Sequence, residues 1–211
     1  MLFRDRIDAG QQLAERLQHL AGTDLVVLGL PRGGVPVAAE VAQALGAPLD
    51  IIVVRKLGAP LQPEFALGAL GEDGVRVMNP EALGYAVATA SELSATEQRE
   101  RQEIARRAER YRGSRERRSL HGRVAVIIDD GIATGSTARA ACQVARALGA
   151  ERVVLAVPVA PEGWEARIGA DADEKISVAT PSWFFAIGQF YEDFGQTTDA
   201  EVTACLNRAT A

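Results

Sequence analysis

The hydrophobic residues of this 211-residue chain follow two alternating patterns, short apolar runs and apolar positions at helical spacing. The apolar runs predict strands at residues 24–30, 50–55, 75–79, 123–129, 152–158 and 175–179. Helical spacing predicts helices at residues 5–21, 35–45, 92–115, 137–148, 162–169 and 199–209, and Ile7, Leu13, Leu17 and Leu20 are expected on one face of the first. Strands that alternate with helices indicate the α/β class, so we expect a doubly wound, mainly parallel sheet flanked by helices.

Two regions interrupt this alternation. Residues 57–74 are rich in proline and glycine and predict a loop or a hairpin. The helix that follows carries nine arginines and five glutamates between residues 97 and 118, and Ser94 with Glu97 predicts a capping box at or near its start. Spacings of three and four residues between Glu and Arg favour ion pairs on a solvated helix over nucleic-acid binding. A contact between two copies through this helix, in a homodimer, stays open.

The composition fits one compact domain. Hydrophobic residues make up 47% of the chain, which is enough for the core of an α/β domain, and neither an internal repeat nor a low-complexity linker divides it. No apolar run reaches membrane-spanning length, and the first ten residues lack the apolar region of a signal peptide. Cys142 and Cys205 are too few and too far apart for a disulfide framework. With a net charge of −5, we expect a cytoplasmic protein that binds neither membranes nor nucleic acid.

The most informative segment is VIIDDGIATGSTA, residues 126–138. Its apolar run predicts a buried parallel strand, and Asp129 and Asp130 stand where that strand ends. Ligands of open α/β sheets bind at the carboxyl ends of the strands, where two carboxylates can accept hydrogen bonds from a ribose diol. Residues 133–137 then open a helix whose free N–H groups and positive dipole end suit a phosphate. The alternative is that the polar residues of this turn only cap the helix. The two adjacent aspartates favour a binding site over this alternative.

On these residues the segment resembles the phosphoribosyl pyrophosphate (PRPP) motif of type I phosphoribosyltransferases, in which an apolar strand, two acidic residues and an apolar stretch precede TGxT. The resemblance implies that Asp129 and Asp130 hold the ribose 2- and 3-hydroxyls. It also implies a 5-phosphate site at Ala133, Thr134, Gly135, Ser136 and Thr137. Members that act on 6-oxopurines often carry a third aspartate at the position of Ala133, so salvage of hypoxanthine or guanine is disfavoured.

A second turn with phosphate-binding features follows the first predicted strand, in GLPRGGVP at residues 29–36. Arg32 supplies charge, and Gly33 and Gly34 let the backbone approach an anion at the start of the next helix. The alternative is a tight turn that needs glycine for its shape alone. In type I phosphoribosyltransferases the same place holds a pyrophosphate loop, often with a non-proline cis peptide, so we expect a cis bond between Pro31 and Arg32.

Arg55 and Lys56 close the second predicted strand, at the same edge of the sheet. Taken alone they would be a pair of solvated surface charges. They resemble an Arg-Lys pair that helps to bind pyrophosphate in the orotate branch of the family. Residues 57–74 would then match the flexible loop that closes over PRPP and keeps water from the reacting centre.

Aromatic residues concentrate in the tail, at residues 181–196. The resemblance implies a hood that selects the base, within a single domain over residues 1–211 that has a core at about 22–180 and a hood from about 1–21 and 181–211. Most of the aromatic rings are expected to form the hood's own core. The candidates for stacking on a flat base are Trp183, Phe184 and Phe185.

The resemblance implies a Mg²⁺-dependent enzyme that transfers the 5-phosphoribosyl group from PRPP to a small heterocyclic base and releases pyrophosphate. Asp129, Asp130, Arg32 and Lys56 would act in catalysis, with Mg²⁺ held mainly by PRPP and water rather than by the protein. The alternative is a non-catalytic PRPP-binding regulatory protein, against which the intact Arg32, Arg55 and Lys56 argue. Adenine, uracil, orotate and other heterocycles stay open as acceptors.

Overall fold

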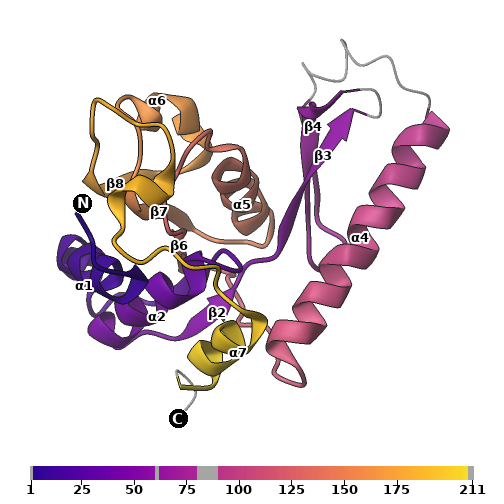
Figure 1. Cartoon of the computed structure of the whole chain (residues 1–211). Coiled ribbons are helices and arrows are strands. Elements are labelled where there is room, and N and C mark those ends of the chain that lie inside the picture. Colours follow the sequence, from indigo (N-terminus) through magenta and orange to yellow (C-terminus); the bar gives the residue numbers. More distant parts are fainter. Residues whose placement is uncertain (1, 60–61, 80–89, 209–211) are drawn as a thin grey trace.

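A parallel sheet forms the centre of the chain in the computed structural model, which describes residues 2–59, 62–79 and 90–208 (Figure 1). Its strands are β1 (Leu25–Gly29), β2 (Leu49–Ile51), β6 (Val124–Ile128), β7 (Arg152–Val159) and β8 (Glu174–Ala179). They are hydrogen-bonded in the order β2-β1-β6-β7-β8, and each neighbouring pair is parallel. The predicted doubly wound, mainly parallel sheet is therefore confirmed.

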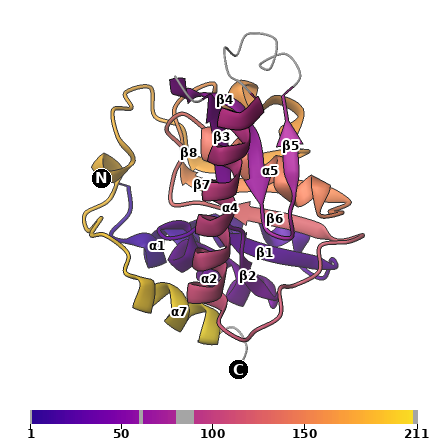
Figure 2. The same cartoon turned by 90° about the vertical axis from the view of Figure 1, so that its right-hand side faces the viewer.

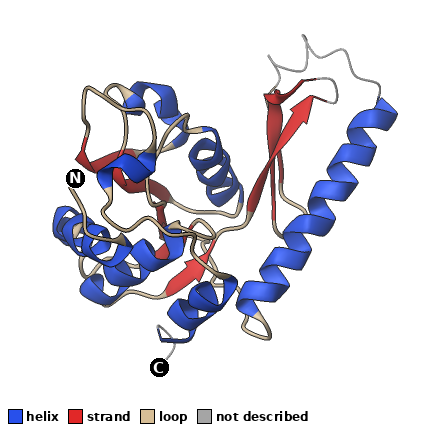
Figure 3. Ribbon diagram, viewed as in Figure 1, coloured by secondary structure: helices blue, strands red, loops and turns tan. Residues whose placement is uncertain are grey.

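Helices cover both faces of this sheet (Figure 3). On one face lie α1 (Arg6–Arg16) and α2 (Gly34–Leu45), and on the other lie α5 (Ser136–Ala147) and α6 (Trp164–Ile168); short 3-10 turns follow at Gln18–Leu20 and Gly169–Asp171. Val27 and Val126 pack with α1 and α2, whereas their neighbours Val26 and Ala125 pack with α5 and α6. Successive side chains of a strand point to opposite faces, so a sheet covered on both sides needs the continuous apolar runs that predicted these strands.

A second, antiparallel sheet projects from the central one and carries a long helix across it (Figure 2). The sheet consists of β3 (Val54–Ala59), β4 (Gln62–Gly71) and β5 (Arg76–Met78) in the order β3-β4-β5, and α4 (Ala90–Arg112) packs against β3 and β4. We call β3, β4, β5 and α4 the arm. The hairpin that residues 57–74 predict is confirmed and the loop alternative is wrong, while the strand expected at 75–79 is β5.

The predicted strand at residues 50–55 is wrong in extent, because it spans two strands of different sheets. The parallel strand β2 ends at Ile51, and β3 of the arm begins at Val54. Ile52 and Val53 lie between them and are buried, so the apolar character continues across the break. Hydrophobicity indicates that a residue is buried but not in which sheet, and the sequence pattern therefore gave no sign of the division.

The apolar face predicted for the first helix is correct except at its start. Leu13, Leu17 and Leu20 are buried, but Ile7 is 47% exposed. A helix turns by about 100° per residue, so Ile7 stands about 240° from Leu13 around the axis of α1 and cannot share its face.

The predicted capping box at Ser94 and Glu97 is wrong. Ser94 lies inside α4, which is already helical at Ala90, and the carboxylate of Glu97 accepts hydrogen bonds from Arg76 and Arg101. The ion pairs predicted at spacings of three and four residues are confirmed along this helix, including Glu97 with Arg101.

The segments predicted to form the hood lie in different layers. Leu13 and Leu17 of α1 belong to the main core, so α1 is part of the layers that cover the sheet. The tail contains the 3-10 turn Ile187–Phe190 and then α7 (Asp199–Arg208), which packs against α2 and α4. Phe3 pairs with Tyr191, so the residues before α1 and the tail share one aromatic cluster.

Cys142 and Cys205 are buried free thiols, as expected. None of the helices in the described ranges has both the length and the apolar surface required to cross a bilayer.

Candidate functional site

The order of the strands leaves a crevice between β1 and β6. β1 leads into α2 and β6 leads into α5, and these two helices cover opposite faces of the sheet. The chain therefore leaves two neighbouring strands toward opposite layers. In open α/β sheets, ligands bind at such a place, in the gap at the carboxyl ends of the two strands. Residues 30–34 follow β1 and residues 129–135 follow β6. Both turns that the sequence marks as candidates therefore meet at this point.

The two turns are in direct contact. The N–H of Leu30 donates to the carbonyl of Ile128 at 2.9 Å. A Cβ on Gly33 would lie 2.0 Å from Oδ2 of Asp130, and a Cβ on Gly34 would lie 2.5 Å from the carbonyl oxygen of Ile128. A side chain at Gly34 would collide with backbone, whereas one at Gly33 would require the side chain of Asp130 to move, so the close contact of the turns depends on both glycines in different ways. The peptide bond between Pro31 and Arg32 is cis, which confirms the prediction.

The two aspartates differ in their surroundings. Nε and Nη2 of Arg6 lie 2.9 and 2.8 Å from Oδ2 of Asp130, whereas Oδ1 of Asp129 accepts the backbone N–H of Asp130. Burial raises the pKa of both carboxyls; the charge of Asp130 adds to the rise at Asp129, and Arg6 opposes the rise at Asp130. Of the two side chains, Asp129 is therefore the one whose ionised form would be stabilised most by a hydrogen-bond donor or a cation from a ligand.

The turn after the aspartates opens α5 with a group of hydrogen-bond donors. Gly135 has a φ of 82°, which glycine adopts without strain, and α5 begins at Ser136. The hydroxyls of Thr134 and Ser136 lie 3.3 Å apart. The first N–H groups of a helix have no partner inside it and point toward its positive dipole end. Residues 133–137 therefore form a surface suited to an anion.

A cavity of about 800 Å³ opens on this turn and extends to the arm. Thr134, Ser136 and Thr137 line it from the core, and Arg55 and Lys56 line it from β3. The other residues predicted to bind PRPP do not line this cavity: Asp129, Asp130, Arg32, Gly33, Gly34, Ala133 and Gly135. Of these, Gly33 and Gly34 meet the acidic pair where the two turns are in contact. Pro31 does line it, so the cavity and the crevice adjoin.

Arg55 and Lys56 reach the cavity from the arm, and not from the end of a parallel strand as the sequence suggested. Nε of Arg55 donates to Oε2 of Glu100 on α4 at 2.7 Å. The guanidinium of Arg99 lies 3.7 Å from the other oxygen of the same carboxylate. The arm thus brings a paired set of charges to the wall of the cavity.

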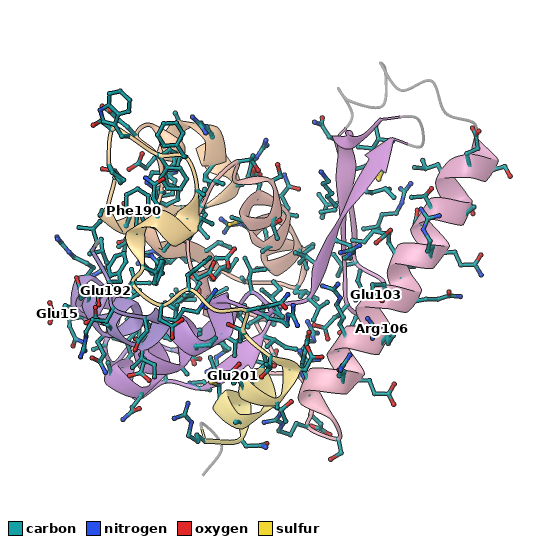
Figure 4. The ribbon with its side chains drawn as sticks, in the orientation of Figure 1. Glu15, Glu103, Arg106, Phe190, Glu192 and Glu201 are labelled. Atoms are coloured by element: carbon teal, nitrogen blue, oxygen red, sulfur yellow. The ribbon has the colours of Figure 1, made fainter. Side chains whose placement is uncertain are left out.

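The aromatic tail forms a small core of its own next to the crevice. Phe184 packs on Phe190, which is labelled in Figure 4, with ring centroids 5.3 Å apart. The hydroxyl of Tyr191 donates to the backbone carbonyl of Asp130 at 2.7 Å and so joins this core to the acidic pair. Trp183 and Phe185 are 76% and 83% exposed, and neither they nor Phe184 line the cavity described above. The prediction that most rings pack among themselves is confirmed.

Sequence reasoning missed Arg6 and the face of α4 that lines the cavity. Besides its pair with Asp130, Arg6 donates to the carbonyl of Gly195 at 2.7 Å and lies 4.1 Å from the ring centroid of Phe194. Its partners stand 124 and 189 positions away in the chain, so no local pattern marks it.

The site offers few ligands for a metal ion. Within residues 2–59, 62–79 and 90–208, no group of three or more His, Cys, Asp or Glu side chains is placed to hold one. Asp129 and Asp130 supply carboxylate oxygens at the crevice. Mg²⁺ keeps several waters and usually takes one or two carboxylates besides substrate phosphates. This donor set therefore fits a Mg²⁺ ion that arrives with a phosphorylated ligand.

Known proteins are similar to this chain in sequence and in fold. Residues 5–194 match the family model described as a phosphoribosyl transferase domain. Two proteins of Mycobacterium tuberculosis, from strains CDC 1551 / Oshkosh and ATCC 25618 / H37Rv, are provisionally named phosphoribosyl transferases and are each 60% identical over 208 residues. The match covers 99% of this chain and 47% of either relative, so the chain spans about half their length. A protein of known crystal structure from Thermus thermophilus is 49% identical, with a TM-score of 0.90 and 99% of both chains covered.

Proposed function

The chain belongs to the phosphoribosyl transferase family, and from this we propose that it transfers the 5-phosphoribosyl group of PRPP to a ring nitrogen of a small heterocyclic base and releases pyrophosphate. One observation carries the proposal: the turn that opens α5 and the basic pair Arg55 and Lys56 share a cavity that adjoins the acidic pair. A reaction of this kind would serve nucleotide salvage or a related process in the cytoplasm.

The parts of PRPP are assigned by their chemistry. Residues Ala133, Thr134, Gly135, Ser136 and Thr137 bind the 5-phosphate through hydroxyls and free N–H groups. Asp129 and Asp130 accept hydrogen bonds from the ribose 2- and 3-hydroxyls. The pyrophosphate is bound by Arg32, Gly33, Gly34, Arg55 and Lys56, which combine positive charge with backbone N–H groups.

The reaction needs little covalent chemistry from the protein. The bond from the anomeric carbon to a pyrophosphate oxygen breaks, and its electron pair leaves with the pyrophosphate. A ring nitrogen of the base forms the new bond with its lone pair, and a proton on that nitrogen passes to the pyrophosphate or to water. Arg32 and Lys56 stabilise the charge that develops on the leaving group, while the acidic pair holds the oxocarbenium-like ribose in line. Catalysis on this scheme is positioning and electrostatic stabilisation.

Mg²⁺ belongs to this proposal as a companion of PRPP. When bound, it neutralises part of the pyrophosphate charge and so assists the departure of that group. It would be held mainly by PRPP and water, with the carboxylates of Asp129 and Asp130 as the acidic side chains near it.

The acceptor base is assigned to the side of the aromatic tail. The hydrogen bond from Tyr191 to the carbonyl of Asp130 supports this, because it fixes the tail against the residues that hold the ribose. Trp183, Phe184 and Phe185 are the rings proposed to stack on the base. Ala133 in place of a third aspartate argues against hypoxanthine and guanine.

Pyrophosphate release from PRPP and Mg²⁺, measured across purine, pyrimidine and pyridine bases, tests the proposal. We expect release that depends on one base. The double variant D129N/D130N should abolish it while the protein stays folded by circular dichroism, and unchanged turnover would refute the assignment. PRPP binding without release for any base would instead favour the alternative, a non-catalytic PRPP-binding regulatory protein.

A further inference from the structure

α4 presents one polar face to the cavity. The residues of α4 that line it are Glu92, Ala95, Thr96, Arg99, Glu100 and Arg107. Spacings of three, four and seven residues place side chains on the same side of a helix. This face of α4 is therefore a second wall of the cavity into which the turn of α5 also points.

Arg106 and Arg107 of α4 both bind the carboxylate of Glu103, but of the two it is Arg107 that lines the cavity. Arg106 donates to both oxygens of Glu103 through Nε and Nη2, a pair that Figure 4 places on α4. Arg107 donates to Glu103 through Nε alone, at 2.6 Å. Within the described ranges, the Nη groups of Arg107 donate no hydrogen bond, and of these two arginines Arg107 lines the cavity. The fork of Arg107 is thus available to a ligand.

Arg107 also stands near the turn that carries Arg32. Tyr111, one helical turn beyond Arg107, donates to Asp199 at 2.9 Å, and Nη1 of Arg32 lies 3.9 Å from the same carboxylate. Burial raises the pKa of Tyr111, and the charges of Arg107 and Arg32 oppose that rise. Arg107 and Arg32 therefore both lie near Tyr111, and Arg107 lines the same cavity as Pro31, the neighbour of Arg32 in the chain.

We propose that Arg107 binds the pyrophosphate group of PRPP together with Arg32, an inference that rests on the proposed function. A guanidinium fork can donate two parallel hydrogen bonds to phosphate oxygens, which a point charge cannot. Glu103 does not occupy the Nη groups of Arg107, because it accepts a hydrogen bond from Nε of that guanidinium alone. The arm thereby contributes a substrate-binding residue from α4 in addition to Arg55 and Lys56 from β3.

The test is the affinity for inorganic pyrophosphate, measured by isothermal titration calorimetry on the full chain. R107Q should weaken binding about tenfold or more, as expected for loss of a hydrogen bond to a charged group. R106Q is the matched control, since it removes the same charge from the neighbouring residue and the same partner Glu103. It should change the affinity less than about twofold. R107K keeps the charge without the fork and should fall between R107Q and the wild type.

The outcomes separate this inference from the proposed function. Equal affinities for R107Q and R106Q, with binding by the wild type, would overturn the role of Arg107 and leave the proposed function standing. A wild-type chain that binds neither pyrophosphate nor PRPP would overturn both. Circular dichroism of each variant shows whether a loss of binding is a loss of fold, and R107K gives a second comparison at the same position.

Discussion

Nη2 of Arg6 lies 2.8 Å from Oδ2 of Asp130, a contact between residues 124 positions apart. The same guanidinium binds the carbonyl of Gly195 and stacks on Phe194. One side chain of α1 therefore joins the acidic pair to the tail. Since both side chains of the ion pair are more than four-fifths buried, the contact also fixes the direction in which Asp130 points. The orientation of the acidic pair thus depends on residues outside its own segment.

R6Q should lower the free energy of unfolding by about 3 kcal/mol, because it leaves the carboxylate of Asp130 without its cation in a buried place. R4Q is the control: Arg4 is 72% exposed and pairs with Asp8 at the surface, so its loss should cost less than about 1 kcal/mol. Urea unfolding near neutral pH measures both variants. Equal losses would show that the Arg6 contact contributes no more than a surface pair.

D129N should make the chain more stable than the wild type at neutral pH. Burial, and then the charge of Asp130, raise the pKa of Asp129 well above its usual value of 3.8. Below the usual pKa of 3.8, the carboxyl is protonated in both the folded and the unfolded chain, so D129N and the wild type should be equally stable there. As the pH rises toward the folded pKa, the unfolded wild type ionises first and wild-type stability falls.

The measurement for D129N is the difference in free energy of unfolding from the wild type, followed from acid to neutral pH. Asn keeps an oxygen that can accept the backbone N–H of Asp130, so this contact is preserved. A difference that does not widen as the pH rises would contradict the raised pKa of the Asp129 carboxyl.

G33A and G34A should separate binding from stability. The Cβ of G33A would meet the end of the Asp130 side chain, which can rotate away from Arg6. The Cβ of G34A would meet the backbone of Ile128 and Asp129, which cannot yield without moving β6. We expect G34A to lose about 2 kcal/mol of stability and G33A less. Both should bind PRPP more weakly in a titration; unchanged affinity in G33A would show that the position of Asp130 is unimportant.

Arg112 should anchor the arm to the core. It is 8% exposed. Its guanidinium lies 3.0 Å from Oδ1 of Asp50, which is in β2 of the core, and 2.5 Å from Oε2 of Glu72, which directly follows β4 of the arm. R112A leaves the buried carboxylate of Asp50 and the partly buried carboxylate of Glu72 without this cation, and we expect it to lose about 4 kcal/mol in urea unfolding. R106Q, at an exposed position of the same helix, serves as the control and should unfold as the wild type does. A small loss for R112A would mean that other contacts hold the arm, such as apolar packing and the hydrogen bond from Tyr111 to Asp199.

Much of the central layer was predictable because its signals are local. A strand buried on both faces requires a continuous apolar run, as in Val126, Ile127 and Ile128, and such a run is visible without any partner. The break between β2 and β3 was not visible, because Ile52 and Val53 are as buried as the residues of β2 that precede them. Hydrophobic patterning reports burial, and the choice between two sheets is made by backbone pairing with distant segments.

Three features follow from local sequence: the parallel sheet, the acidic pair at the end of β6 and the turn that opens α5. Each depends on residues close together in the chain. Three others are set by the packing of distant segments: the contact of Arg6 with Asp130, the position of Arg55 and Lys56 on the arm, and the place of Arg107 in the wall of the same cavity. These contacts join segments far apart in the sequence. Their geometry follows from how the layers pack, and no spacing along the chain encodes it.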